Sequence, residues 1–331
     1  MKLNLEQIKS ITKGAARVVS DNGKVKFMRF TEEQERFYEQ YPDFHKKTFA
    51  TAGVRLEFVT GSRSLSLKVD VTPASSRTRF EHAIFVNGEL KYTLGADLSD
   101  TPDKHITAEG SYALGTGKKT VCIYFPWSVC SELISLELDN GAAAVPVTRA
   151  RKILMFGDSI THGYDAKYPS EAYSSLLTDA LDAEGLNKGI GGDRFNAALG
   201  AMAESYVPDI ITVAYGTNDW AHGDGDRLAK ESRGFFEALA RTYPSSKIFA
   251  LAPIWRGNWE SVTGAGRFED VEKLLSDIAS GIPNMTVINC FDFVPHNAAM
   301  FSPDVLHPNS LGFSHYAQSL IAEIKERIKQ S

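Results

Sequence analysis

From about residue 150 to the end of the chain, short apolar runs alternate with longer amphipathic stretches. The apolar runs occupy residues 152–156, 210–215, 247–252 and 285–291, and a weaker run ends near Ile190. Four stretches repeat apolar residues at helical spacing, at 173–181, 235–239, 271–278 and 316–328. This alternation is typical of parallel strands joined by helical crossovers. It predicts an α/β domain over residues 149–331, with a doubly wound, five-stranded parallel sheet flanked by helices.

The first 148 residues follow a different pattern. Segments 54–59, 64–71, 83–86 and 120–125 alternate with period two and are rich in β-branched and aromatic residues, as strands are. The pair Asn87-Gly88 stands between two such runs, which predicts a two-residue hairpin turn. We therefore expect residues 1–148 to form an accessory β-sandwich of the jelly-roll type. The polar and aromatic stretch from Glu32 to Tyr41 fits either a short helix or a loop.

The composition narrows the classes of partner. The 331 residues include 43% hydrophobic and 23% charged residues and carry a net charge of −5, without a run of Lys or Arg longer than two or three. These values indicate a globular protein with a sizeable core, and they disfavour nucleic acid or an anionic membrane as partner. No segment has the apolar length of a secretory signal or a membrane span, so a cytoplasmic location is expected. A homo-oligomer is compatible with the sequence but is not specified by it.

Three cysteines give an odd count. Cys122, Cys130 and Cys290 have no spacing typical of metal ligands. We therefore expect buried free thiols and neither a disulfide framework nor a metal site.

The motif GDSITHG, residues 157–163, follows the first apolar run of the predicted sheet directly. A strand that ends in a glycine-hinged turn lifts its serine hydroxyl clear of the sheet, and a following helix offers free N–H groups there. Far downstream, DVLHP at residues 304–308 supplies an imidazole and a carboxylate three residues before it. His307 could take the proton of Ser159, and Asp304 could orient the His307 ring.

Two further motifs lie near the ends of neighbouring strands. GIGGD occupies residues 189–193 and YGTND occupies residues 215–219. The N–H of Gly192, the side-chain amide of Asn218 and the N–H of Ser159 could together bind the oxygen of a tetrahedral intermediate. The choice of Gly192 over Gly191 rests on the aspartate that follows it. Ligands of such sheets bind beyond the carboxyl ends of the strands, where all these motifs are expected.

These four blocks, in this order, resemble those of the SGNH (GDSL) hydrolase superfamily over residues 151–330. The resemblance implies a serine esterase in which Ser159 is the nucleophile, His307 the base and Asp304 its orienting partner. It also implies an oxyanion hole formed by Ser159, Gly192 and Asn218, and a reaction that needs no metal and no other cofactor.

A jelly-roll-like domain before an SGNH domain resembles the carbohydrate esterases of family 2 and related two-domain enzymes. This resemblance implies hydrolysis of O-acetyl esters on xylan- or mannan-derived oligosaccharides through an acyl-serine intermediate. Without a secretion signal, the expected substrates are imported oligosaccharides. The alternative is a short-chain lipid, thioester or sialate O-acyl esterase, because this chemistry is insensitive to what carries the acyl group. The intact motifs disfavour a third reading, a glycan-binding module with an inactive hydrolase half.

Three tryptophans follow strands of the predicted sheet on the catalytic edge. Trp220, Trp255 and Trp259 are therefore candidates for stacking on sugar rings or acyl chains. For Trp255 and Trp259, packing in the core is an equal alternative. Asp158 and Asp219 flank the catalytic positions, and we interpret them as local hydrogen-bond partners of their turns.

Overall fold

The computed structural model describes residues 1–329 and divides into two compact units. The first unit comprises Met1–Arg149 and the short segment Tyr168–Ser170, and the second comprises Ala150–Lys167 and the residues from Glu171 onward. Within residues 1–329, no helix has both the length and the apolar character needed to cross a membrane.

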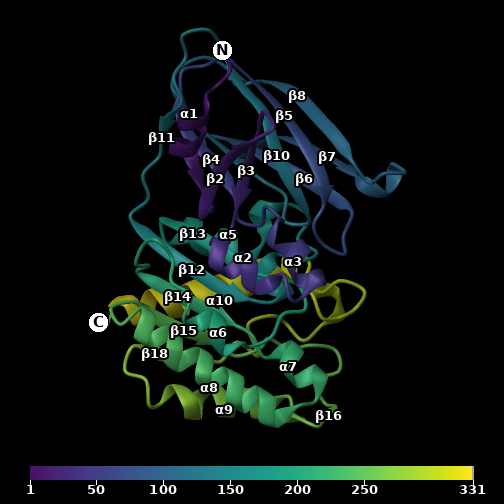
Figure 1. Cartoon of the computed structure of the whole chain (residues 1–331), viewed down its shortest axis with the longest axis vertical. Helices are drawn as coiled ribbons and strands as arrows, with labels where there is room; N and C mark the ends of the chain where they lie inside the picture. The colour runs from purple at the N-terminus through teal and green to yellow at the C-terminus, as the bar shows by residue number, and fades with distance from the viewer. Residues whose placement is uncertain (330–331) are drawn as a thin grey trace. The chain divides into compact units, whose positions relative to one another are not determined.

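The first unit is an antiparallel β-sandwich, as predicted (Figure 1). One sheet has the order β1-β4-β9-β6-β7, with β11 also paired to β4. Its strands are β1 (Thr12–Lys13), β4 (Arg55–Thr60), β6 (Arg79–Val86), β7 (Glu89–Asp97), β9 (Lys119–Tyr124) and β11 (Val145–Pro146). The other sheet has the order β2-β3-β10-β5-β8. Its strands are β2 (Arg17–Asp21), β3 (Lys24–Met28), β5 (Ser64–Pro73), β8 (Ile106–Ala113) and β10 (Val129–Leu138).

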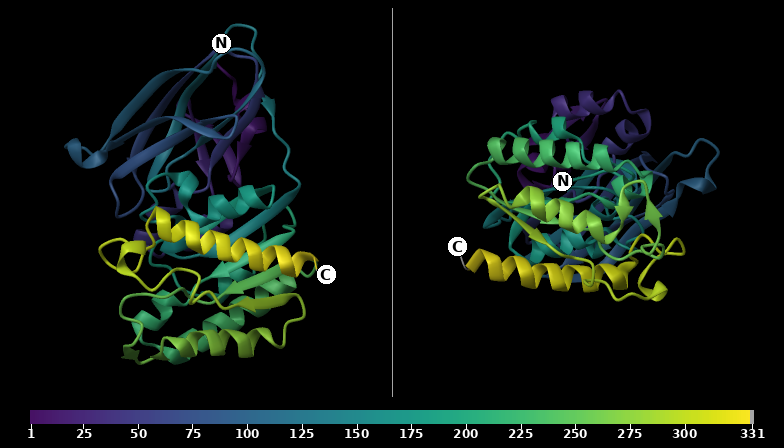
Figure 2. Two further views of the ribbon diagram at one scale, coloured as in Figure 1. Left: turned by 180° about the vertical axis from the view of Figure 1, so that it is seen from behind. Right: turned by 90° about the horizontal axis from the view of Figure 1, so that it is seen from below.

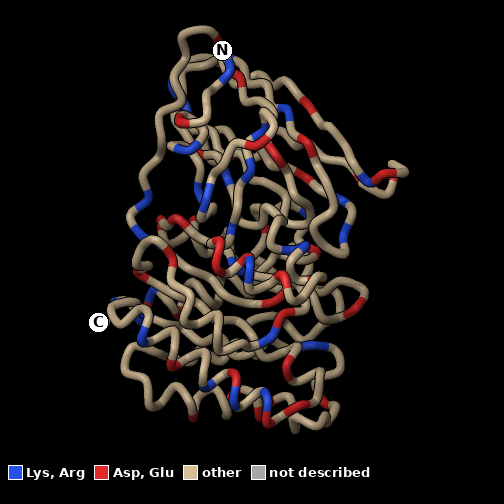
Figure 3. Tube along the Cα trace, in the orientation of Figure 1, with Lys and Arg blue, Asp and Glu red and all other residues tan. Residues whose placement is uncertain are grey.

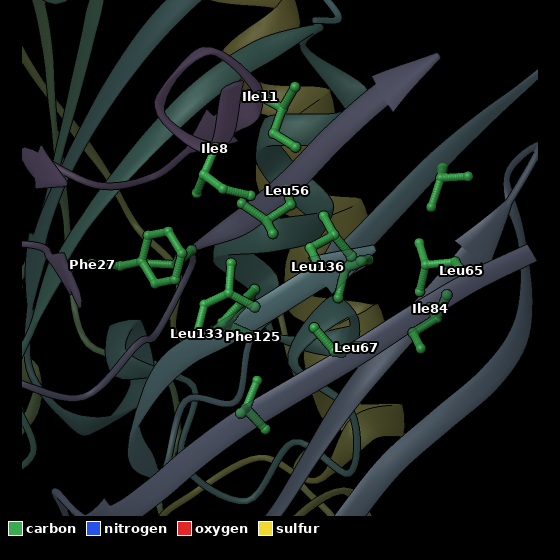
Figure 4. Packing of buried hydrophobic residues seen from close by; sticks show 14 of the residues in the cluster. Ile8, Ile11, Phe27, Leu56, Leu65, Leu67, Ile84, Phe125, Leu133 and Leu136 are labelled. Atoms are coloured by element: carbon green, nitrogen blue, oxygen red, sulfur yellow. The ribbon is translucent and has the colours of Figure 1, made fainter. Parts of the chain in front are cut away.

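The two sheets of this unit enclose an apolar core (Figure 4). Along β5, Leu65, Leu67 and Val69 are buried, because alternate residues of a strand point to the same face. Leu56 of β4 and Leu133 of β10 contribute to the same cluster from the two sheets. Each such side chain removed from water stabilises the fold by about 1.5–3 kcal/mol.

The hairpin predicted from Asn87-Gly88 is confirmed, since these two residues connect β6 to β7. Their φ values, 51° and 80°, are both in the left-handed region that the type I′ turn requires. The stretch from Glu32 to Tyr41, for which the sequence fits either a helix or a loop, is largely helical. Helix α2 (Glu32–Tyr38) is followed by α3 (Pro42–Thr48). Thr31 and Gln34 form a capping box at the start of α2, a signal that the sequence carries.

The second unit has the predicted five-stranded parallel sheet, with strand order β13-β12-β14-β15-β18. The strands are β12 (Arg151–Gly157), β13 (Ala183–Gly189), β14 (Ile210–Ala214), β15 (Lys247–Leu251) and β18 (Met285–Ile288). Helix α5 (Tyr173–Ala180) packs against α10 (Ser310–Lys329), while α8 (Gly225–Thr242) packs against α6 (Ala197–Gly200) and α9 (Glu269–Ala279). Figure 2 shows α10 in yellow as one long helix beside the sheet.

The shorter elements complete the two units. They are α1 (Leu5–Ile11), α4 (Ser159–His162), α7 (Thr217–His222), the hairpin of β16 (Val262–Thr263) and β17 (Gly266–Arg267), and 3₁₀ turns at Leu98–Asp100, Pro169–Glu171 and Ala298–Met300. Cys122 and Cys290 are buried thiols, as predicted, whereas the Cys130 thiol belongs to a residue that is only partly buried. Basic and acidic residues are interspersed along the trace (Figure 3), which agrees with the small net charge.

Candidate active site

Strand β12 carries the serine motif to the carboxyl end of the parallel sheet. Its four apolar residues, 153–156, are buried, and hydrogen-bonded neighbours flank the strand on both sides. The strand ends at Gly157, where a Cβ atom would lie only 2.1 Å from Oγ1 of Thr161 and 2.9 Å from the carbonyl oxygen of Ala214. Only glycine allows the chain to turn this closely against its neighbours.

Ser159 opens the helix after this turn. The Oδ1 atom of Asp158 accepts a hydrogen bond of 2.9 Å from the Ile160 N–H and so caps the helix. The helix is a single turn, because Gly163 with φ of 102° ends it four residues later. The next α-helix, α5, begins at Tyr173.

Three strands end at the same level beside Ser159. In the parallel register, Gly157 pairs with Gly189 of β13 on one side and with Ala214 of β14 on the other. The segments that follow these strands therefore leave one edge of the sheet together. This register brings the motifs at 157–163, 189–193 and 215–219 to the same edge, as the sequence predicts.

Ser159, His307 and Asp304 are joined in a hydrogen-bonded chain. The Oγ atom of Ser159 lies 2.8 Å from Nε2 of His307, and Nδ1 of His307 lies 2.6 Å from Oδ2 of Asp304. Ser159 and His307 are both buried, at 5% and 9% exposure. The imidazole tautomer with its proton on Nδ1 satisfies both contacts, since it donates to Asp304 and accepts from the serine hydroxyl.

The loop before α10 holds Asp304 and His307 in place. The second carboxylate oxygen of Asp304 accepts hydrogen bonds from the backbone N–H groups of Leu306 (3.0 Å) and His307 (3.1 Å). Partial burial opposes ionisation of Asp304, but these two donors and the His307 ring outweigh it and hold the carboxyl pKa below its usual value. Asp304 is therefore the ionised partner that an Nδ1–H group needs.

The backbone of this loop is strained between the two residues. Val305 has φ of 50°, a left-handed conformation that is unfavourable for a β-branched residue. Its carbonyl oxygen accepts a 2.8 Å hydrogen bond from the N–H of Gly257. A Cβ atom on Gly257 would lie 2.9 Å from Cγ1 of Val305, so the loop at 257 is fitted against this turn. Strain of this kind persists where the surrounding structure enforces it, commonly at functional sites.

The candidate oxyanion donors lie on the two neighbouring loops. Gly192 has φ of 87°, which glycine adopts without cost. Nδ2 of Asn218 donates a 3.0 Å hydrogen bond to the carbonyl oxygen of Asp193, the residue after Gly192. This bond ties the second and third motifs together, and the second amide hydrogen of Asn218 remains to serve a ligand.

Two buried carboxyl groups, those of Asp158 and Asp219, flank the predicted catalytic residues in the sequence. Burial, reinforced by the nearby charges of Asp219 and Asp193, raises the pKa of Asp158 to about 7. Burial also raises the pKa of Asp219, although this carboxylate forms a 3.0 Å ion pair with Arg227. As expected, Asp158 caps its own turn, whereas Asp219 accepts a 3.4 Å hydrogen bond from the backbone N–H of Phe195, which lies on another loop.

The structure corrects the expectation for Trp220. Its side chain is only 1% exposed, and its indole N–H donates a 3.1 Å hydrogen bond to the carbonyl oxygen of Gly266. One neighbour is the Phe268 ring, at an edge-to-face distance of 5.0 Å. The other is the guanidinium of Arg256, 5.2 Å from the indole centroid. Trp220 therefore packs in the core and offers no free face to a substrate.

Trp255 and Trp259 are both partly exposed. Trp255 stacks on His296 with a centroid distance of 5.3 Å and lies 5.2 Å from Phe301. Trp259 meets the edge of Phe291. Since Phe301 pairs with Pro308, the Trp255 ring belongs to the loop cluster that holds His307.

Arg256 is a residue of the site that the sequence did not reveal. Its Nη1 atom donates to the carbonyl oxygen (3.2 Å) and to the hydroxyl (3.0 Å) of Thr217, the residue before Asn218. Burial lowers the pKa of the guanidinium, while the negative charges of Asp158 and Asp304 act in the opposite direction. Arg256 thus anchors the turn that presents Asn218.

No sequence motif pointed to Asp165 either. One of its carboxylate oxygens lies 3.8 Å from Nδ1 of His307. Asp165, Asp304 and His307 form the group in residues 1–329 whose ligand atoms lie close enough, within 4.8 Å of one another, to hold a metal ion. Both nitrogens of His307 are already hydrogen bonded, so a metal bound there would compete with the contacts to Ser159 and Asp304.

Comparison with known proteins places most of the α/β unit in a family. Residues 155–314 match the model of the GDSL-like lipase/acylhydrolase family. No curated protein sequence matches the chain significantly.

Solved structures resemble the chain along almost its whole length. A salicylyl-acyltransferase from a tetracycline biosynthetic pathway superimposes with a TM-score of 0.82 at 21% identity, covering 95% of this chain and 94% of its own. A putative GDSL-like lipase from Bacteroides ovatus gives 0.78 at 18% identity, with coverages of 99% and 98%. A family two carbohydrate esterase from Cellvibrio japonicus gives 0.68 at 16% identity, with coverages of 97% and 96%. At these identities, the likeness establishes the shared two-part fold.

Proposed function

Through residues 155–314 the chain belongs to the GDSL-like lipase/acylhydrolase family, and from this premise we propose that it removes O-acetyl groups from xylan- or mannan-derived oligosaccharides. The observation that carries the proposal is the unbroken contact chain from Ser159 through His307 to Asp304, with distances of 2.8 and 2.6 Å. Acyl transfer to a serine requires a base within hydrogen-bond reach and an orienting group behind that base.

The proposed reaction has two halves. His307 accepts the hydroxyl proton of Ser159 at Nε2 while Oγ attacks the ester carbonyl, and the resulting imidazolium returns the proton to the leaving sugar oxygen. Water, activated by the same nitrogen, then attacks the acyl-serine, and acetate leaves as Ser159 recovers its proton. Asp304 keeps the other imidazole proton on Nδ1 throughout and stabilises the cation.

The negative oxygen of each tetrahedral intermediate needs donors that are already in place. The N–H groups of Ser159 and Gly192 and the amide of Asn218 are assigned to this role. Support comes from the shared sheet edge and from the bond that links Asn218 to the segment after Gly192. Loss of one such donor commonly costs about 3 kcal/mol of transition-state stabilisation, or roughly a hundredfold in rate. Asn218→Ala is therefore expected to lower kcat by that order.

A carbohydrate carrier for the acetyl group is supported by two features. The likeness in fold includes a family two carbohydrate esterase over almost the whole chain. In the catalytic unit, Trp255 and Trp259 are partly exposed on the loop whose Gly257 N–H donates to the carbonyl oxygen of Val305, and aromatic faces are apt to stack on sugar rings. Replacement of either ring by alanine should raise KM for an acetylated oligosaccharide and leave hydrolysis of a small aryl acetate almost unchanged.

The direct test measures acetate released from acetylated manno- and xylo-oligosaccharides, beside hydrolysis of acetyl and octanoyl model esters. Wild type is compared with Ser159→Ala. Acetate release that this substitution abolishes is the expected result. A preference for the octanoyl ester without release of acetate from sugars would overturn the proposed substrate class and favour a lipid or thioester carrier.

A further inference from the structure

A second carboxylate lies at the same imidazole nitrogen as Asp304. The Oδ2 atom of Asp165 is 3.8 Å from Nδ1 of His307, and the Asp304 oxygen is 2.6 Å from the same atom. The Asp165 side chain is 16% exposed and is thus more buried than that of Asp304, which is 39% exposed. Charges of partly buried groups at such distances are only weakly screened by water and salt.

The two carboxylates come from different parts of the chain. Asp304 belongs to the loop before α10, whereas Asp165 belongs to the turn that follows the nucleophile. Gly163 ends α4 with φ of 102°, and its carbonyl oxygen accepts a hydrogen bond from the Ala166 N–H, so the chain folds back at once. Asp165 itself has φ of 69°, a left-handed conformation that aspartate and asparagine tolerate better than most residues. The turn that presents Ser159 therefore also brings a carboxylate to its base.

We propose that Asp165 is a second positioning residue for His307, acting on Nδ1 beside Asp304. The inference rests on the proposed serine esterase reaction and deepens the description of its site. When Nε2 of His307 takes the proton of Ser159, the ring becomes a cation, and its Nδ1–H then lies between two negative charges. Either carboxylate alone favours the tautomer with its proton on Nδ1, which leaves Nε2 free to act as the base.

The ring of Tyr164 lies 5.5 Å from that of His307. Arg256 is the cation whose charge acts on Asp304, and Asp158 is the further acid within its field. Neither replaces a carboxylate at Nδ1.

The kinetic test is a double-mutant cycle with Asp165→Asn, Asp304→Asn and the double variant. Asparagine preserves the shape of both side chains and tolerates the left-handed backbone at position 165. We expect kcat/KM to fall about threefold for Asp165→Asn and about tenfold to a hundredfold for Asp304→Asn. The double variant should lose about 10⁴-fold, the loss typical when a triad histidine has no carboxylate to select its tautomer. Asp277→Asn on α9, combined with Asp304→Asn, is the matched control and should multiply the single effects only.

A spectroscopic readout separates failure of this inference from failure of the proposed function. In protein with ¹⁵N-labelled histidine, the ring nitrogens of His307 are assigned with His307→Gln, and their shifts report which nitrogen carries the proton of the neutral ring. The Nδ1–H form should dominate in wild type and in both single variants, and a mixture of tautomers should appear only in the double variant. This readout does not need an active enzyme, so an inactive wild type would refute the esterase proposal alone.

Two results would overturn the role of Asp165. One is a double variant whose kcat/KM loss equals the product of the single losses. The other is a tautomer that already shifts fully in Asp304→Asn, with no further change on replacing Asp165. Thermal midpoints of all variants show whether a loss of activity reflects unfolding.

Discussion

Asp158→Asn is expected to stabilise the catalytic unit at alkaline pH and to change it little under acidic conditions. Asp158 is 2% exposed, and Oδ1 of its carboxyl group caps the short helix that begins at Ser159. An asparagine retains that acceptor, because it is itself a good helix cap. Unlike the carboxylate, it cannot become a buried charge.

The magnitude follows from the shifted pKa. Burial raises the Asp158 pKa from 3.8 to about 7, so the folded state binds this proton more tightly than the unfolded chain does. Stability from the bound proton is complete below the unfolded value and is lost as the pH rises through 7. One pKa unit corresponds to 1.36 kcal/mol, which gives a total of about 4 kcal/mol. Between pH 5 and pH 8 the loss is about 2.5 kcal/mol.

The assay is urea denaturation of wild type and Asp158→Asn at these two pH values. Three of the four tryptophans lie in the α/β unit, so a Trp127→Phe background makes the fluorescence report that unit. The contributions of the other titrating groups cancel in the difference in free energy of unfolding between variant and wild type. It should grow by about 2.5 kcal/mol in favour of the variant from pH 5 to pH 8. An equal difference at both pH values would refute the reasoning.

Two other substitutions test contacts near the site. Gly257→Ala should lower kcat about tenfold to a hundredfold, because the new methyl group displaces the Val305 turn between Asp304 and His307. Gly281→Ala, whose Cβ meets only ordinary contacts, is the control, and equal kcat values for both variants would contradict the account. Trp220→Phe should cost about 1–3 kcal/mol of stability, because the carbonyl of Gly266 loses its buried donor, with KM unchanged. A higher KM without loss of stability would instead return this ring to the substrate site.

The strands and the main helices of both units could be predicted because their hydrophobic periods are long and regular. The position of the site at the carboxyl ends of the strands could be predicted equally well, because parallel strands end together and three of the four motifs follow a strand directly. Ser159 and His307 lie far apart in the sequence. Their contact could still be predicted, because a serine nucleophile requires such a base.

Other features depend on tertiary contacts that no local pattern reports. Trp220 is buried by the hairpin of β16 and β17, whose strands of two residues each are too short to show a period. Asp165 and Arg256 gain their positions only where separate loops meet. Helix α4 has only one turn because Gly163 ends it with a left-handed φ. This end could have been predicted, since glycine commonly terminates helices.

The proposed reaction requires that Ser159 becomes acetylated during turnover. Rapid acid quenching of the enzyme with an acetyl ester, followed by peptide mass spectrometry, would detect this intermediate directly. The account predicts one added acetyl group on the peptide that contains Ser159, with more of it in His307→Gln, where slow acylation by a reactive ester is followed by still slower hydrolysis, and none in Ser159→Ala. Turnover of the ester with no acetyl group on Ser159 under any quench time, or an acetyl group on another residue, would contradict it.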